Sequence, residues 1–320
     1  MRRFEEPAAG HDGESLRDDV SASVSRAATA GRNLWNPVPP QARRPGRAAP
    51  GGDRRPVGIR RSTNTVGGEQ VEGRQAVREL LAAARRPVRE VWLIEGSDPA
   101  PILGEIDNLA RARHVPVRMV SSRRLESVQR TETPQGVVAF ADPLDVHDLT
   151  ELATGGTDEE PPSAPFLVVV DGVTDPHNLG AILRTAECAG ATGAVLPRHR
   201  AVHVTAAVTK AAAGAVEHIP IALVPGIPSA LQELERLGVR TVGLDEHGEQ
   251  SLFALDLGEE PIALVLGAEG RGLSPLSRRR CAQVASIPLH GAIGSLNVST
   301  AAAVACFEVA RARGGRTAGS

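Results

Sequence analysis

Several residue types and sequence patterns are scarce or missing in this 320-residue chain, and each absence argues against particular classes of protein or of binding site. Its three cysteines, Cys188, Cys281 and Cys306, lie far apart and form neither a CxxC pair nor a Cys/His ligand spacing. Structural zinc sites and disulfide frameworks need such spacings. We therefore expect three reduced thiols in or near the core of a cytoplasmic protein, and no metal.

The chain also lacks a membrane signature and an excess of charge. Its N-terminus has no apolar segment of the signal-peptide kind, and no run approaches the roughly 20 apolar residues that cross a bilayer. We expect a soluble intracellular protein. The formal net charge is -2, so any nucleic-acid binding has to come from local patches. Lys210 is the only lysine, and arginine carries the remaining side-chain positive charge.

Two phosphate-binding patterns are missing as well. No predicted strand is followed by the GxGxxG fingerprint of dinucleotide-binding folds or by a Walker A motif. Their absence argues against a nucleotide-dependent oxidoreductase, which needs such a glycine loop.

The composition divides the chain into five segments. Residues 1–64 are rich in Arg, Pro, Gly, Ala and Ser without a sustained period, which predicts a disordered basic arm. Seven arginines face one acid between positions 43 and 61, a pattern typical of an RNA-tracking arm or of a merely solubilising tail. Residues 142–165 are acidic and rich in Gly and Pro, which predicts an interdomain linker with one short helical turn. Residues 315–320 form a tail.

The pattern over residues 65–141 predicts a small α/β unit, a compact binding module. Apolar periodicity indicates helices over 74–84, 101–113 and 122–129, and strands over 88–94, 115–120 and 136–140. Its exposed arginines form either a solvated face or an RNA surface; they include Arg111, Arg113, Arg123, Arg124 and Arg130.

Residues 166–314 alternate apolar runs with helical patterns. The runs predict strands over 166–170, 194–196, 219–224, 239–244, 262–266 and 284–288, and the patterns predict helices over 179–189, 205–215, 229–237, 275–281 and from about 297 to 313. This alternation predicts a mostly parallel sheet covered on both faces. Ligands of such sheets bind beyond the carboxyl ends of the strands, where three loops stand out.

The first of these loops follows residue 170 and contains Asp171, His177 and Asn178. Asn178 lies where a helix is expected to start, and by itself it is typical of a helix cap. Arg184 lies about 9 Å further along that helix, at roughly 1.5 Å per residue. Asp171, His177 and Asn178 crowded into one strand-to-helix loop favour a functional site.

The second and third loops follow residues 266 and 288. In LGAEGRGLSP, Gly267, Gly270 and Gly272 allow a close backbone approach, and Glu269 places a carboxylate in the loop. In HGAIGSLNVSTAAAV, Ser295 and Asn297 flank Leu296 just before an apolar helix. Asn297 is either an ordinary N-cap or part of a ligand site at the free N–H groups of that helix.

Taken together, Asn178 with Arg184, Glu269 within GAEGRGL, and Ser295 with Asn297 resemble the three motifs of the SpoU/TrmH family of RNA 2′-O-ribose methyltransferases. The resemblance spans residues 166–313. The segment KAAAGAVEHIPI (210–221) is similar to the bacterial 23S rRNA guanosine branch, and the unit opening EGRQAVRELL is similar to the substrate-binding domain of that branch.

The resemblance implies an α/β, SPOUT-type parallel sheet with a C-terminal trefoil knot, preceded by a ribosomal-protein-like substrate-binding domain. It also implies S-adenosylmethionine (AdoMet) as cofactor, RNA as substrate and a homodimer. The implied catalytic residues are Arg184, Asn178, Glu269, Ser295 and Asn297. The implied cofactor-binding residues are Leu266, Gly267, Gly270, Ile287, Leu289, Ser295, Leu296 and Asn297.

The resemblance gives the central catalytic role to Arg184. A guanidinium keeps its proton in proteins, so we expect Arg184 to hold a phosphate and polarise the ribose hydroxyl rather than to act as a base. His177 and His290 are nearby candidates for a base, and the chemistry needs no metal.

The expected target is a guanosine of 23S rRNA, which would make the chain an rRNA-processing enzyme. A transfer-RNA 2′-O-methyltransferase and a non-catalytic RNA-binding ribosome assembly factor are the alternatives. Two departures from the family pattern, Ala212 in place of a frequent Ser and Gly294 in place of an acid, bear on the target rather than on the reaction.

Overall fold

The structure is a computed structural model that describes residues 65–66, 69–96, 100–155, 164–199, 203–258 and 260–314. The predicted arm over 1–64 and the tail over 315–320 lie outside the described residues. Among the described residues, no helix is long and apolar enough to cross a membrane.

The N-terminal unit is a four-stranded sheet with the strand order β2-β5-β3-β4. Only β3 and β4 pair in parallel, and the other neighbours are antiparallel. Apolar side chains of α1 and α2 bury one face of the sheet, and α3 packs near Trp92 on the other. The strands are β2 (Gln70–Glu72), β3 (Val88–Ile94), β4 (Val117–Val120) and β5 (Val137–Ala141), and the helices are α1 (Arg74–Ala83), α2 (Pro101–Ala112) and α3 (Ser122–Glu126).

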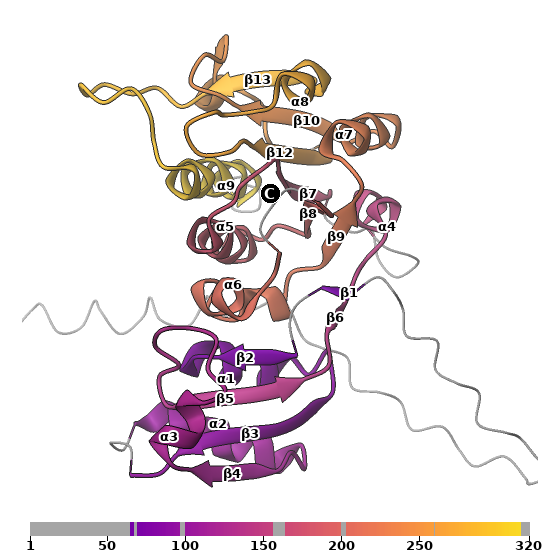
Figure 1. The fold of residues 1–320 in the computed structure, drawn as a ribbon. Coiled ribbons are helices and arrows are strands. Elements are labelled where there is room, and N and C mark those ends of the chain that lie inside the picture. The colour runs from indigo at the N-terminus through magenta and orange to yellow at the C-terminus, as the bar shows by residue number, and fades with distance from the viewer. Residues whose placement is uncertain are drawn as a thin grey trace, which may run out of the picture. The chain divides into compact units, whose positions relative to one another are not determined.

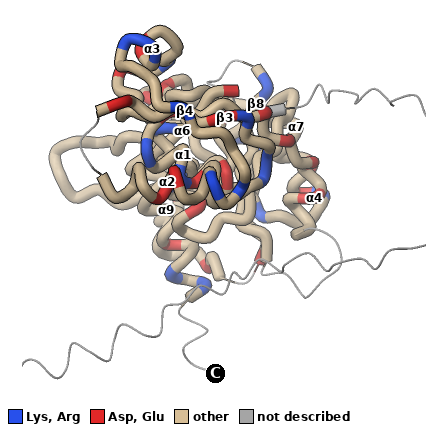
Figure 2. The backbone as a smooth tube through the Cα atoms, turned by 90° about the horizontal axis from the view of Figure 1, so that it is seen from below, with Lys and Arg blue, Asp and Glu red and all other residues tan. Residues whose placement is uncertain are grey.

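The predicted arginine face of this unit is largely committed to internal contacts. Arg111 pairs with Asp107, the Arg113 guanidinium donates to the carbonyl of Ala82, and Arg124 lies over the ring of Trp92. Figure 2 shows basic and acidic residues interspersed along the tube rather than gathered by sign. Solvated, paired arginines therefore account for much of this pattern.

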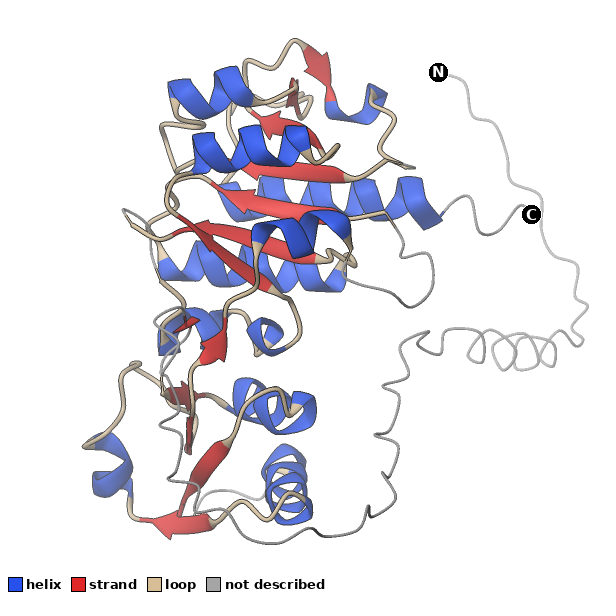
Figure 3. Cartoon of the chain, turned by 90° about the vertical axis from the view of Figure 1, so that its right-hand side faces the viewer, coloured by secondary structure: helices blue, strands red, loops and turns tan. Residues whose placement is uncertain are grey.

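The second sheet has seven strands in the order β11-β13-β10-β12-β7-β8-β9, all of them parallel. Its strands are β7 (Phe166–Val170), β8 (Gly193–Pro197), β9 (Ile221–Val224), β10 (Arg240–Leu244), β11 (Gln250–Ser251), β12 (Ile262–Leu266) and β13 (Gln283–Ser286). The helices around it are α4 (Leu149–Thr154), α5 (Pro176–Cys188), α6 (Ala206–Ala211), α7 (Ile227–Arg236), α8 (Pro275–Arg280) and α9 (Val298–Gly314). Figure 3 shows the strands flanked by helices.

Continuous apolar strands produce a sheet buried on both faces. Successive side chains of a strand point to opposite sides, so Phe166, Val168 and Val170 join the core under α5 and α9, whereas Leu167 and Val169 join the core under α4 and α7. In Figure 1, α5, α6 and α9 accordingly lie on one side of the strands, and α4 and α7 lie on the other.

The strand order places a topological switch point between β7 and β12. From β7 the chain builds the sheet outward through β8 and β9, and it then returns to place β12, β10 and β13 on the other side of β7. After β13 it crosses back over the carboxyl ends of the strands, because α9 packs against α5 and β12. The three loops singled out in the sequence therefore meet at one edge of the sheet.

Four short strands, β1, β2, β6 and β11, were not predicted from the sequence. Two of them, β1 (Thr65–Val66) and β6 (Leu144–Asp145), pair with each other. The helical turn expected in the linker is α4, whose Asp148 forms a capping box with Glu151. The helix expected over 205–215 is interrupted: α6 ends at Ala211, and the short 3-10 helix η1 (Ala215–Glu217) follows left-handed residues at Ala213 and Gly214.

The segment 210–218 attaches the N-terminal unit to the large sheet. Glu217 forms a fully buried ion pair with Arg86, whose Nη1 also donates to the carbonyl of Asp142 over 2.8 Å. His218 contacts Glu79 at 2.8 Å, and the ammonium of Lys210 donates to the Thr133 hydroxyl over 2.6 Å. Removing either partner of the Arg86–Glu217 pair would leave an uncompensated buried charge, which destabilises a protein strongly.

Candidate active site

The first loop positions Asn178 differently from the sequence interpretation. Helix α5 is capped by Asp175, whose Oδ1 accepts from the amide of His177 over 2.8 Å, and it begins at Pro176. The alternative that Asn178 is only a helix cap is therefore excluded, because Asp175 caps α5. An Asp-Pro pair is the usual start signal, and it was available in the sequence. Asn178 lies within the first turn, and its side chain is free to reach other loops.

Asn178 lies at the centre of a chain of hydrogen bonds that joins all three loops. The Ser299 hydroxyl donates to Asn297 Oδ1 over 2.6 Å, Asn297 Nδ2 donates to Asn178 Oδ1 over 3.1 Å, and Asn178 Nδ2 donates to Glu269 Oε1 over 2.8 Å. Every bond points toward the Glu269 carboxylate, so the dipoles reinforce one another. We call these four residues the amide relay.

Asn297 has both of the roles that the sequence left open. Its Oδ1 accepts from the amide of Ser299 over 2.8 Å at the start of α9, and its Nδ2 reaches Asn178. The cap of α9 therefore also fixes the first loop.

A tight hairpin presents Glu269 to the relay. Ala268 and Gly272 exchange both backbone hydrogen bonds, each 2.9 Å long. A Cβ added to Gly267 would lie 2.1 Å from the carbonyl carbon of Gly272, and Gly270 has a φ of 72°. Side chains at these positions would clash or strain the backbone, so the glycines of this loop define its shape.

A cavity of about 390 Å³ adjoins the relay at the carboxyl ends of β10, β12 and β13. This volume lies within the usual range of small-ligand sites. Asn297 is the one predicted cofactor-binding residue that does not line the cavity, and it belongs to the relay instead. The predicted residues that do line it are Leu266, Gly267, Gly270, Ile287, Leu289, Ser295 and Leu296.

One wall of this cavity follows β10 and contains a residue that was not among the predicted site residues. Asp245 lines it, with Oδ1 bound to Arg278 Nη1 at 2.6 Å and to the amide of His247 at 2.9 Å. Burial alone would raise the pKa of Asp245, but the hydrogen bonds from Arg278 and His247 hold it below its ordinary value. A carboxylate directly after a buried strand was the signal that could have identified it.

Arg184 is not part of the relay. It lies on the exposed side of α5 and makes no hydrogen bond or ion pair within the described part of the chain. Ser295, His177 and His290 are also exposed, and none of the three joins the relay. Arg184 therefore keeps its full hydrogen-bonding capacity for a ligand.

The cysteines offer no nucleophile to the site. Burial raises the pKa of Cys306 to about 12, and burial together with the Asp171 charge raises the pKa of Cys281 to about 12. Cys188, expected near the core, is instead exposed at the end of α5. Within the described ranges, no three His, Cys, Asp or Glu side chains are grouped to hold a metal ion. What this edge offers is a small-ligand cavity beside a relay that can orient a polar substrate.

Comparison with known proteins identifies the class of this protein. Residues 165–307 match the SpoU rRNA Methylase family, and residues 70–146 match the domain described as RNA 2′-O ribose methyltransferase substrate binding. The chain is also 38% identical to a 23S rRNA (guanosine-2′-O-)-methyltransferase, RlmB of Pseudomonas putida, over 77% of this chain and 97% of that protein. The chain belongs to the SpoU family of RNA 2′-O-ribose methyltransferases.

Further relatives are similar in sequence and in structure. RlmB of Ralstonia nicotianae is 43% identical over 65% of this chain and 82% of its own length. The AdoMet-bound rRNA methyltransferase of Sinorhizobium meliloti superposes with a TM-score of 0.61 at 26% identity, over 76% of this chain and 86% of that one. The SpoU methyltransferase AviRb of Streptomyces viridochromogenes superposes with a TM-score of 0.63 at 25% identity, over 77% of this chain and 90% of that one.

Proposed function

We propose that the chain transfers a methyl group from AdoMet to the ribose 2′-hydroxyl of a guanosine in 23S rRNA, in the cytoplasm. The observation that carries this proposal is the amide relay, which joins three separate segments of the chain at the rim of a small-ligand cavity through the hydrogen bonds among Ser299, Asn297, Asn178 and Glu269. The guanosine target is supported by the names of the relatives, which match this chain over nearly their whole length.

The cavity suits the cofactor in its chemistry. Apolar side chains such as Leu244, Leu266 and Ile287 offer a surface for an adenine, and the glycine hairpin lets a ligand approach the backbone. Ser295 and Leu296 also line the cavity. When bound, AdoMet supplies a methyl group on a positively charged sulfur, which a hydroxyl oxygen can attack.

The roles of the protein side chains follow from their geometry. The Asn178 and Asn297 amides hold the Glu269 carboxylate at the rim of the cavity, where it can orient the incoming ribose. Arg184 would bind a phosphate of the RNA and draw electron density from the target hydroxyl. As the ribose oxygen accepts the methyl group that the cofactor would supply, its hydroxyl proton would leave to solvent. Alignment of this kind lowers barriers by several kcal/mol.

We also propose a division of labour along the chain. Residues 65–141 would bind RNA with a ribosomal-protein-like fold, residues 142–165 would link it to the catalytic unit, and residues 166–314 would bind the cofactor. The passage of the chain from β13 back to α9 would complete a trefoil knot. The exposed Phe307 on α9, 52% accessible, would lie against a second copy of the chain in a homodimer.

The direct test is methylation of unmodified RNA by the purified chain. With AdoMet carrying a labelled methyl group, we expect label in 23S rRNA at one guanosine ribose, and the same position unmodified in a deletion strain. Label found only in transfer RNA would show that the substrate is transfer RNA and not 23S rRNA. Binding of AdoMet without transfer to any RNA would support the assembly-factor alternative.

Replacement of Arg184 tests its role separately. Arg184→Ala should abolish methylation and leave AdoMet affinity nearly intact, whereas Arg184→Lys should restore part of the RNA binding because it keeps a positive charge. A large loss of cofactor affinity in Arg184→Ala would refute the assigned role.

A further inference from the structure

One wall of the cavity holds a carboxylate oxygen without a partner. Asp245 directly follows β10, and its side chain is 13% exposed. Oδ1 accepts from Arg278 and from the amide of His247, as described above. Oδ2 accepts no hydrogen bond from any residue that the structure describes. A mostly buried carboxylate with one unpaired oxygen facing a cavity needs a hydrogen-bond donor from water or from a ligand.

The surroundings of Asp245 keep this oxygen open and its position fixed. A Cβ on Gly272 would lie 3.4 Å from Oδ2, so the glycine leaves room where a side chain would crowd the carboxylate. Arg278 also donates through Nη2 to the carbonyl of His247 over 3.0 Å, which ties the loop after β10 to α8. The carboxylate is therefore held by one oxygen and presents the other.

The strand order indicates which part of a ligand meets Asp245. The relay lies at β7 and β12, and β10 is the next strand beyond β12, at a spacing of about 4.8 Å. The reacting sulfur of a methyl donor must lie at the relay. The apolar residues Leu244 and Ile287 line the cavity on the β10 and β13 side, where an adenine would pack. The group between base and sulfur is the ribose, which carries two adjacent hydroxyl donors.

We propose that Asp245 Oδ2 accepts hydrogen bonds from the ribose hydroxyls of the bound S-adenosyl group and thereby selects for a ribonucleoside cofactor. The inference rests on the proposed function, because it takes AdoMet as the ligand of this cavity. Asp245 acts here as a binding residue, and Arg278 acts as its positioning residue.

The test uses the reaction product, S-adenosylhomocysteine, and its 2′-deoxy and 3′-deoxy analogues in isothermal titration with the full-length protein. Hydrogen bonds to a charged acceptor contribute about 1.5–3 kcal/mol, so the wild type should bind at least one deoxy analogue roughly 10- to 100-fold more weakly. Asp245→Asn is isosteric and keeps an oxygen for Arg278, but it presents an NH₂ group to the cavity. This variant should discriminate less than about threefold.

Arg278→Gln is the matched control, because it removes the ion pair to Oδ1 and keeps the Asp245 carboxylate, which the amide of His247 still binds. It should retain discrimination between ribose and deoxyribose even where its overall affinity falls. Full discrimination by Asp245→Asn would overturn the proposal, as would equal binding of all three ligands by the wild type. If 5′-methylthioadenosine, which lacks the amino acid, binds Asp245→Asn and wild type alike, Oδ2 contacts the α-ammonium group and the proposal fails. No binding of S-adenosylhomocysteine by the folded wild type would instead refute the proposed function itself.

Discussion

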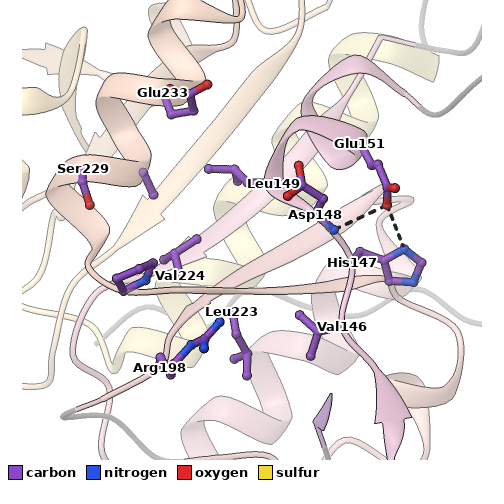
Figure 4. A pocket seen from close by; sticks show the side chains of 12 residues that line it. Val146, His147, Asp148, Leu149, Glu151, Arg198, Leu223, Val224, Ser229 and Glu233 are labelled. Atoms are coloured by element: carbon purple, nitrogen blue, oxygen red, sulfur yellow. Dashed lines mark hydrogen bonds and ion pairs between the residues drawn. The ribbon is translucent and has the colours of Figure 1, made fainter. Parts of the chain in front are cut away.

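Two cavities lie at carboxyl ends of strands of the same parallel sheet, and the larger one is the poorer candidate for a site. The first adjoins the amide relay and measures about 390 Å³, and the second lies between β9, α4 and α7 and measures about 490 Å³. Figure 4 shows the second cavity with His147, Asp148 and Glu151 on one side and Ser229 and Glu233 on the other.

The polar side chains of the second cavity are already engaged within the protein. Asp148 caps α4, Glu151 completes the capping box, and His147 contacts Arg85 and Glu151. Ser229 donates to the carbonyl of Gly226, and Glu233 pairs with Arg236. These groups stabilise local structure, so little hydrogen-bonding capacity is left for a ligand.

The first cavity offers free capacity instead. Asp245 Oδ2 and the Arg271 guanidinium have no hydrogen-bond partner in the described ranges, and the hairpin at Gly267 exposes backbone. The difference between the two cavities shows that unpaired polar groups, rather than volume, mark the better candidate for a binding site.

The largest expected effect comes from closing the first cavity. Gly267→Ala places a Cβ against backbone atoms of Gly272 and Leu273 that cannot move aside, so we expect a cost of a few kcal/mol and no detectable AdoMet binding. Titration calorimetry measures the binding, and circular dichroism reports the fold. Gly104→Ala is the control, because a Cβ there meets nothing within 4 Å and helix propensity improves. Unchanged AdoMet affinity in Gly267→Ala would contradict the assigned cavity.

A smaller but still large effect is expected from the relay. Asn178→Ala removes the donor to Glu269 and the acceptor for Asn297, and we expect the methylation rate to fall by about 100-fold or more. AdoMet affinity should change less than threefold, because Asn178 does not line the cavity. Single-turnover kinetics with saturating cofactor separates the two quantities. A pure loss of cofactor affinity would place Asn178 in the binding site instead.

A moderate, pH-dependent effect is expected at Asp245. Its folded pKa is lowered, so its carboxylate stabilises the folded protein above the unfolded pKa of about 4 and loses that contribution as the pH falls through the folded value. In urea unfolding, wild type should be more stable than Asp245→Asn at neutral pH, and the difference should disappear in acid. A difference that stays constant with pH would show that charge is not its source.

The smallest effect is expected in the second cavity. Glu233→Gln loses an exposed ion pair with Arg236, and such pairs contribute little. We expect stability to change by less than about 0.5 kcal/mol and both AdoMet affinity and methylation rate to stay within twofold. A clear loss of either activity would reverse the ranking of the two cavities.

Local patterns in the sequence predicted the sheet and the loops of the site, but not how the loops meet. The apolar runs over 166–170 and 262–266 coincide with β7 and β12. Strands β1, β2, β6 and β11 have only two or three residues, too few to show a period. Asp245 follows a predicted strand, which was a local signal, but only the strand order brings the end of β10 beside β12, and such long-range pairing is not readable from a local pattern.

The hydrogen-bond partners of the site residues could not be predicted from the sequence either. The motifs pointed to Asn178 and Asn297, yet the bond between their amides joins residues 119 positions apart. Ser299 was missed because a serine in the first turn of a helix has an ordinary role in capping.

The central claim is that the cavity beside the amide relay, and not the larger one, holds the methyl donor. Titration of AdoMet into the folded wild type, Gly267→Ala and Glu233→Gln tests it most directly. The account predicts saturable binding of one AdoMet per chain in wild type and Glu233→Gln, and none in Gly267→Ala. Binding that survives Gly267→Ala but is lost in Glu233→Gln would contradict it.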